Sequence, residues 1–148
     1  MILCKSLYYS LFHCHLIYAI EIWSNVPPFN LKPLITKQKA AIRIISNQPY
    51  NAHTEHLFKS LSILPLPQLI TQFNLKLIHS FQYNLIPPAF HGTWITTLKN
   101  RHNLANFNFF NLRNNDDLYT PPARTVFLSR VPLYSLPTLW NDLPPNLK

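Results

Sequence analysis

The sequence predicts a mainly α fold: a small helical bundle of about four helices, followed by an irregular C-terminal tail rich in Pro and Asn. Apolar residues recur at helical spacing through residues 2–85, which is the pattern of amphipathic helices. Prolines rather than glycines separate these runs, since the chain has fourteen prolines and one glycine, Gly92. Because the turns of β-meanders and barrels usually call for glycine, an all-β fold is disfavoured.

The first predicted helix covers residues 2–24. Its apolar residues form two stripes, which are Leu7, Leu11, Tyr18 and Ile22 on one side and Tyr8, Phe12, His15 and Ala19 on the other. Two apolar stripes indicate contacts on two sides of the helix. The helix is expected to stop at Pro27 and Pro28, because proline and the residue before it oppose helix continuation.

The second predicted helix covers roughly residues 30–47, with Asn30 as its N-cap and Pro49 beyond its end. The residues expected to face the core are Leu31, Leu34, Ile35, Ile42 and Ile45. A polar and basic row recurs at helical spacing along another face and consists of Lys32, Thr36, Lys39, Arg43 and Asn47.

Two further helices are predicted. A short one runs from the expected N-cap Thr54 to about Leu61. The next covers roughly residues 66–85 and ends before Pro87-Pro88. Its continuous apolar face consists of Leu66, Leu69, Ile70, Phe73, Leu77, Phe81 and Leu85.

The character of the chain changes after Phe90, which predicts three regions. Residues 1–90 form the helical bundle, residues 91–118 an Asn-rich linker, and residues 119–148 a segment of prolines and aromatics. Within the last region we expect one short strand at 125–128 and one helical turn at 137–143.

Charge and cysteine content narrow the functional classes. The net charge is +8 with a pI near 9.7, which favours an anionic partner such as nucleic acid or an anionic membrane surface. One glycine excludes dinucleotide-binding loops and P-loops, which need several. Two cysteines, Cys4 and Cys14, favour a reducing compartment, so we expect an intracellular location in cytoplasm or nucleus.

No pattern in the sequence predicts catalysis or metal binding. His13 and His15 would diverge by about 200° on a helix, and His53 and His56 have no evident third ligand. The adjacent pair Asp116-Asp117 lies in the Asn-rich stretch, without the apolar hairpin that a polymerase metal site requires. We therefore expect no catalytic residue, no metal ligand and no cofactor in this chain.

The basic row of the second helix is the stronger candidate for a binding site. From Lys32 to Arg43 it extends about 16 Å, roughly five phosphates of one duplex strand. Arg113, Arg124 and Arg130 add charge in the tail. The interleaved aromatics Phe127, Tyr134 and Trp140 suit base stacking. The candidate nucleic-acid-binding residues are Lys32, Lys37, Lys39, Arg43, Arg124 and Arg130. The alternative is a solvated helix face with buried tail aromatics, and the pattern alone leaves both open.

Three stretches together resemble a known family. They are "LYYSLFHCHLIYAIEIWSN", "KQKAAIRIISNQPYNAHTEHLFKSLSILPL" and "RTVFLSRVPLYSLPTLWNDLPPNLK". Their order and spacing resemble the region downstream of the palm in reverse transcriptases of non-LTR retrotransposons, the LINE/jockey-like group. The matching positions are Leu7, Tyr8, Ser10, Leu11, Leu16, Tyr18, Trp23, Gln38, Lys39, Ala41, Ile42, Arg43, Ile45, His53, Thr54, Leu57, Phe58, Leu61, Leu64, Arg124, Tyr134, Pro137, Leu139, Trp140, Asn141, Leu143 and Pro144.

The resemblance implies a fragment of an RNA-directed DNA polymerase, made of the thumb and the connector after it. Such a thumb is a helical bundle that grips the RNA/DNA template-primer duplex. The palm and fingers are missing from this sequence, so the aspartates that bind Mg²⁺ are expected only in the missing palm. Asp116-Asp117 differs from the palm's Y-x-D-D motif in order, context and position. The chain alone is therefore expected not to be catalytic.

Two other readings remain open at this point. The alternative to a binding fragment is a non-functional structural remnant whose apolar first helix packs on the missing palm domain and which would aggregate alone. A third reading is a small membrane-anchored protein that uses residues 7–23. His13, His15 and Glu21 within that run weigh against the membrane reading.

Overall fold

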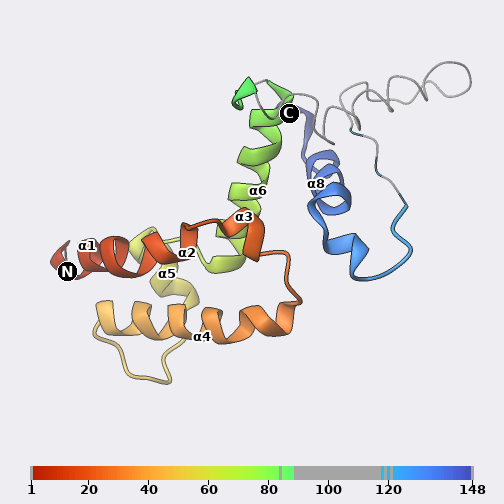
Figure 1. The fold of residues 1–148 in the computed structure, drawn as a ribbon. Helices are drawn as coiled ribbons and strands as arrows, with labels where there is room; N and C mark the ends of the chain where they lie inside the picture. Colours follow the sequence, from red (N-terminus) through yellow and green to blue (C-terminus); the bar gives the residue numbers. More distant parts are fainter. Residues whose placement is uncertain (1, 84, 89–117, 119, 121, 148) are drawn as a thin grey trace, which may run out of the picture. The chain divides into compact units, whose positions relative to one another are not determined.

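The computed structural model describes residues 2–83, 85–88, 118, 120 and 122–147 (Figure 1). These residues are mainly helical, with no strand among them, which confirms the predicted mainly α fold. In chain order the elements are α1 (Ile2–Leu7), the π-helix η1 (Tyr8–His13), α2 (Cys14–Ile17), α3 (Ile20–Trp23), α4 (Pro28–Ile45), α5 (Glu55–Leu61), α6 (Leu66–Gln82), the 3₁₀ helix η3 (Leu128–Arg130), α8 (Pro132–Asn141) and the 3₁₀ helix η4 (Pro145–Leu147).

Several sequence predictions lie outside the described residues. These are the predicted linker at 91–118, of which only Leu118 is described, and within it Arg113 and the pair Asp116-Asp117. The chain divides into two compact units, residues 1–73 and 74–148, and the division falls within α6. Each unit is described by itself below.

The first predicted helix is interrupted, so its predicted continuity is wrong. Helical structure runs from Ile2 to Ile17, stops at Tyr18 and Ala19, and resumes for one turn in α3. Ala19 has a left-handed backbone with φ of 49°. The indole nitrogen of Trp23 donates a hydrogen bond of 2.8 Å to the Tyr18 carbonyl oxygen, which a continuous helix would pair with the amide of Ile22. A side chain thus replaces the backbone donor at the break.

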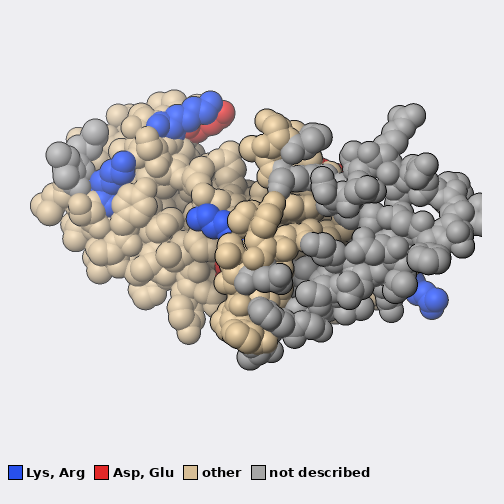
Figure 2. Space-filling view, turned by 90° about the horizontal axis from the view of Figure 1, so that it is seen from above, with Lys and Arg blue, Asp and Glu red and all other residues tan. Residues whose placement is uncertain are grey.

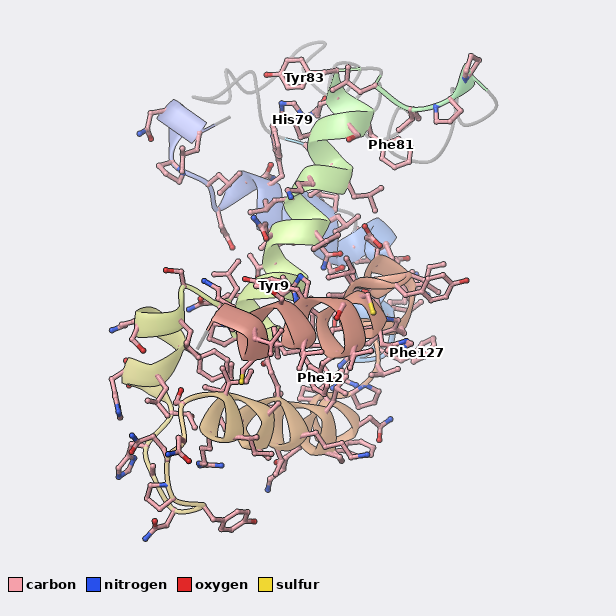
Figure 3. The ribbon with its side chains drawn as sticks, turned by 90° about the vertical axis from the view of Figure 1, so that its left-hand side faces the viewer. Tyr9, Phe12, His79, Phe81, Tyr83 and Phe127 are labelled. Atoms are coloured by element: carbon pink, nitrogen blue, oxygen red, sulfur yellow. The ribbon has the colours of Figure 1, made fainter. Side chains whose placement is uncertain are left out.

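The two apolar stripes of this N-terminal segment, residues 2–23, have different surroundings. Tyr8 is buried and Phe12 packs in the core, on the side that faces α4, whereas Tyr9 lies on another side (Figure 3). The other stripe, Leu7, Leu11, Tyr18 and Ile22, is exposed, and Leu3 extends it. The predicted contact on two sides is therefore wrong for the described residues, which cover one side only.

Helix α4 is longer and more regular than the segment before it. It begins at Pro28, and Pro27 rather than the predicted Asn30 occupies the N-cap position. Proline suits the first helical position because its φ is already helical and its missing N–H has no partner there. At the other end, the amides of Asn47 and Gln48 bond to the carbonyls of Ile44 and Arg43 at 3.1 and 2.9 Å. With Asn47 at φ 51°, these bonds form a Schellman end, which stops the helix before Pro49.

Helix α5 has Thr54 at its N-cap position as predicted, but the Thr54 side chain makes no capping hydrogen bond. The helix ends in a second Schellman arrangement, with Ser62 at φ 54° and the Ile63 amide bonded to the Phe58 carbonyl at 3.0 Å. Ile63 is buried with Phe58, which is the apolar contact that usually accompanies this kind of helix end.

Unit 1 has two apolar clusters. One holds buried residues from η1, α4, α5 and the following turn: Tyr8, Ile42, Leu57, Phe58, Leu61 and Ile63. The second holds buried residues from α2, α3 and α6: Leu16, Ile20, Leu66 and Leu69. Phe12 packs against both clusters and links them. The inward faces predicted for α4 and for the start of α6 are thus confirmed.

In unit 2, the described part of the predicted tail contains α8 and two 3₁₀ turns. The strand predicted at 125–128 is wrong, because Val126 and Phe127 lie in a turn that leads into η3. The Leu128 amide donates to the Thr125 hydroxyl oxygen at 3.2 Å, a local bond that competes with extended structure.

The helical turn predicted at 137–143 belongs to the longer helix α8, which begins at Pro132. Trp140 is buried with Ile78, Leu118 and Leu136. The Asn141 side chain bonds both the amide and the carbonyl of Leu118 at 2.8 Å. The Trp140-Asn141 pair thus has a structural role in unit 2.

Candidate nucleic-acid interface

The solvent side of α4 carries three of the predicted binding residues. Lys32, Lys37 and Lys39 are exposed, and none of them forms a salt bridge with a described residue. The ion pair that the described residues do form joins the Lys59 Nζ and a Glu55 carboxylate oxygen at 3.5 Å, on α5. The three ammonium groups on α4 are therefore not neutralised by neighbouring carboxylates of the described chain.

A buried glutamine sets the rotation of α4 about its axis. Gln38 lies between Lys37 and Lys39 in sequence but is 1% exposed. Its side-chain nitrogen donates to the Tyr8 hydroxyl oxygen and to the Leu64 carbonyl oxygen, both at 3.0 Å. Its side-chain oxygen accepts from the Leu66 amide at 2.8 Å. These bonds hold α4 so that the flanking lysines face solvent.

Tyr8, which accepts one of these hydrogen bonds from Gln38, is also buried. Burial raises the pKa of its hydroxyl above the ordinary value, and nearby Tyr9 adds to the rise, while the hydrogen bond from Gln38 opposes it. The hydroxyl therefore stays neutral at physiological pH, and it accepts the Gln38 hydrogen bond in that form.

Arg43, the fourth predicted residue on this helix, is half-buried and has a local structural role. Its Nε donates a 2.9 Å hydrogen bond to the Ala52 carbonyl oxygen, and its guanidinium carbon lies 5.8 Å from the centre of the Tyr50 ring. These contacts hold the loop between α4 and α5 against the end of α4. One of its five N–H donors is thus engaged with the loop, and the other four remain for an anion.

Two exposed aromatic side chains lie at the ends of the basic row and were missed by the sequence reasoning. Phe29, 73% exposed, precedes Lys32 by three residues on α4. Tyr50, 84% exposed, lies against Arg43 at the other end. Helical spacing from Lys32 would have found Phe29. The position of Tyr50 beside the basic row depends on its contact with Arg43 in the folded loop, so no sequence pattern indicated it.

The predicted binding residues of the tail lie in unit 2. Arg124 is exposed in a bend, and Arg130, at the end of η3, is half-buried. Of the aromatics predicted to stack on bases, Phe127 is exposed, Tyr134 is half-buried and Trp140 is core. Trp140 therefore follows the alternative reading of a buried tail aromatic.

The histidines and cysteines of the described residues form no metal site. No group of three potential ligands converges within this part of the chain. Cys4 and Cys14 are both free and exposed. His13 has a buried Nδ1 without a hydrogen-bond partner, and burial lowers the pKa of its imidazole.

The surface seen from above in Figure 2 shows no row of Lys and Arg side chains like the one on α4. Lys and Arg side chains are scattered there, and most of the visible described surface is neither basic nor acidic.

Among the helices of the described residues, none combines the length and the hydropathy that a membrane crossing requires. Comparison with protein-family models, with curated proteins and with solved structures found no match to this chain.

Proposed function

We propose that this chain is a thumb-like fragment of a non-LTR retrotransposon reverse transcriptase, which binds an RNA/DNA template-primer duplex and has no catalytic residues of its own. The observation that carries the proposal is the exposed, unneutralised row of lysines on α4, above all Lys32 and Lys39. The sequence resemblance supplies the family, and the net charge of +8 agrees with an anionic partner.

The proposed mechanism is contact with the phosphate backbone. Ammonium groups along a rigid helix release the counterions that surround the duplex, so binding carries little sequence information. Gln38 contributes indirectly, because its bonds to Tyr8, Leu64 and Leu66 prevent rotation of α4. Mg²⁺ and the reacting groups belong to a palm domain outside these residues. We also propose an intracellular location, on the basis of the two free cysteines.

Filter binding to an RNA–DNA hybrid at several salt concentrations tests this function. For the double variant Lys32→Glu with Lys39→Glu, we expect weaker binding and a log–log salt slope reduced by about 1.8, which corresponds to two lost phosphate contacts on a duplex. Lys5→Glu, on α1, is the control for a charge reversal away from α4, with half the change in net charge of the double variant, and is expected to leave the slope nearly unchanged.

An unchanged affinity and an unchanged salt slope in the double variant would remove α4 as the contact. Lys39→Glu with Arg43→Glu is a less specific choice, because Arg43 also holds the loop through Ala52. Loss of binding in that variant could come from loop movement, so circular dichroism and thermal unfolding of each variant accompany the titration.

A second candidate function rests on the exposed apolar stripe of the N-terminal segment. Its side chains are Leu3, Leu7, Leu11, Tyr18 and Ile22. Exposed apolar side chains of this number are typical of a surface that packs on another domain, and the resemblance implies that this domain is a palm. On this reading the chain is a structural remnant that aggregates alone and is soluble only with the palm.

Co-expression with a palm-containing segment separates the two candidates. The structural reading predicts aggregation of the chain alone and a soluble complex on co-expression. It also predicts that Leu7→Ser with Leu11→Ser keeps the chain monomeric and abolishes the complex, with Leu85→Ser as the control at an exposed leucine elsewhere. A wild-type chain that stays monomeric alone and ignores the palm would eliminate this reading.

A further inference from the structure

A polar pocket adjoins the basic row of α4 in unit 1. Its lining residues come from α4, from α5 and from the residues that precede α5: Lys39, His53, Thr54, Glu55, His56 and Lys59. Its volume is about 550 Å³, larger than a single phosphate group requires. All of its lining residues except Thr54 are exposed, so the pocket opens to solvent.

The chemistry of the lining favours an anion. The ionisable lining consists of two ammonium groups, two imidazoles and one carboxylate, that of Glu55. This carboxylate lies 3.5 Å from the Lys59 ammonium. The Lys39 ammonium has no such partner among the described residues. Imidazole N–H groups donate hydrogen bonds in either protonation state, so His53 and His56 add donors whatever their charge.

Thr54 adds a neutral donor at the edge of the core. Its residue is buried, yet its hydroxyl makes no capping bond to α5. A hydroxyl without a capping role can donate to a ligand in the pocket that it lines. A divalent cation is a poorer occupant, because the described His, Cys, Asp and Glu side chains nowhere bring three ligands together.

We propose that this pocket binds a phosphate group, held by the Lys39 ammonium, the imidazoles of His53 and His56 and the Thr54 hydroxyl. The inference rests on the proposed function in one respect, that the phosphate belongs to a nucleic acid lying along α4. Lys39 is shared by the pocket and the basic row, so a strand that follows the row brings a phosphate to the pocket. The same chemistry would also hold free phosphate.

The test uses the full chain and two ligands, inorganic phosphate and an RNA–DNA hybrid. Phosphate is titrated while the histidine side-chain resonances are followed by NMR, and hybrid affinity is measured by filter binding. The test variant is His53→Ala with His56→Ala, which removes both N–H donors, and the control is His15→Ala, at an exposed histidine outside the pocket. We expect phosphate to shift the resonances of His53 and His56 but not of His15.

We also expect the double variant to bind the hybrid more weakly, by about tenfold for each of the two hydrogen bonds lost. The pocket proposal is overturned if phosphate leaves both histidines unchanged, or if the double variant binds both ligands as the wild type does. Lys32 lies outside the pocket, so loss of hybrid binding in Lys32→Glu would still support the α4 function. Phosphate shifts without any hybrid binding would retain the pocket, for free phosphate, and reject the α4 function.

Discussion

Helix α4 and the N-terminal segment belong to the same unit and pack against each other, yet they differ in regularity and in the face each exposes. Helix α4 is continuous from Pro28 to Ile45, buries Ile42 and exposes lysines. The N-terminal segment contains a π-turn and a break at Ala19, buries Tyr8 and exposes apolar side chains.

The difference teaches that the same core can carry two outer faces of different chemistry. The outer face of α4 carries lysines that attract anions, beside the exposed Phe29 and Ile44, whereas the exposed side chains of the N-terminal segment are apolar and gain from a covering partner. The two candidate functions correspond to these two faces. Experiments that distinguish the helices therefore also distinguish the functions.

The largest expected effect compares the two faces of α4. Ile42 is fully buried and Ile44, two residues later, is 79% exposed. We expect Ile42→Ala to lower the free energy of unfolding by about 3 kcal/mol, through lost burial and the cavity left behind. Ile44→Ala is the matched control, with an expected change within about 0.5 kcal/mol. Urea denaturation measures both, and equal effects would mean that α4 packs on another face.

The second effect concerns the bond network between α4 and the N-terminal segment. Gln38→Leu keeps much of the side-chain volume but leaves the Leu64 carbonyl and the Leu66 amide without this partner. We expect a loss of about 2 kcal/mol, since buried polar groups left unsatisfied cost about 1–3 kcal/mol each. Lys37→Leu, at the exposed neighbouring position, is the control. A neutral Gln38→Leu would show that the network does not fix α4.

A smaller effect on stability, of opposite sign in α4 and in the N-terminal segment, tests the helix break at Ala19. Ala19→Gly is expected to stabilise the protein by about 1 kcal/mol, because a left-handed backbone is costly for a residue with a Cβ atom. Ala40→Gly, within continuous α4, is expected to destabilise it by about 1 kcal/mol. Thermal unfolding of both variants measures the signs. Destabilisation by Ala19→Gly would indicate that the segment is helical through residue 19.

The smallest effect is a dependence of stability on pH that comes from the N-terminal segment. Burial lowers the pKa of His13 in the folded chain, so at acidic pH the unfolded chain binds more protons. This contribution is present above the unfolded pKa of about 6.5 and is lost as the pH falls through the folded pKa.

The urea concentration at the midpoint of unfolding, measured at about pH 5 and at about pH 7.5, brackets this titration. We expect His13→Gln to flatten the decline in stability between the two pH values, and His15→Gln, at an exposed position, to leave it as in the wild type. A decline that persists unchanged in His13→Gln would assign it to other groups.

Much of the fold could be predicted from the sequence because hydrophobic periodicity and proline positions act locally. The inward faces of α4 and of the start of α6 follow from apolar spacing, and the end of α4 falls close to the predicted position. The prediction of Asn30 as a cap was wrong because Pro28 already starts the helix. The strand at 125–128 was wrong because the β-branched and aromatic residues there have no neighbouring strand among the described residues, and a local Thr125 bond forms instead.

The candidate site was predictable only in part. The sequence alone determined that Lys32, Lys37, Lys39 and Arg43 share one helix, since charge and spacing are local properties. Only the tertiary structure decided that Gln38 is buried, that Arg43 is engaged with the loop and that Lys39 meets His53 and His56 at one pocket. It also decided which apolar stripe of the N-terminal segment is covered. The physical reason is that side-chain periodicity defines faces, whereas burial and hydrogen bonds depend on which distant segment packs on each face.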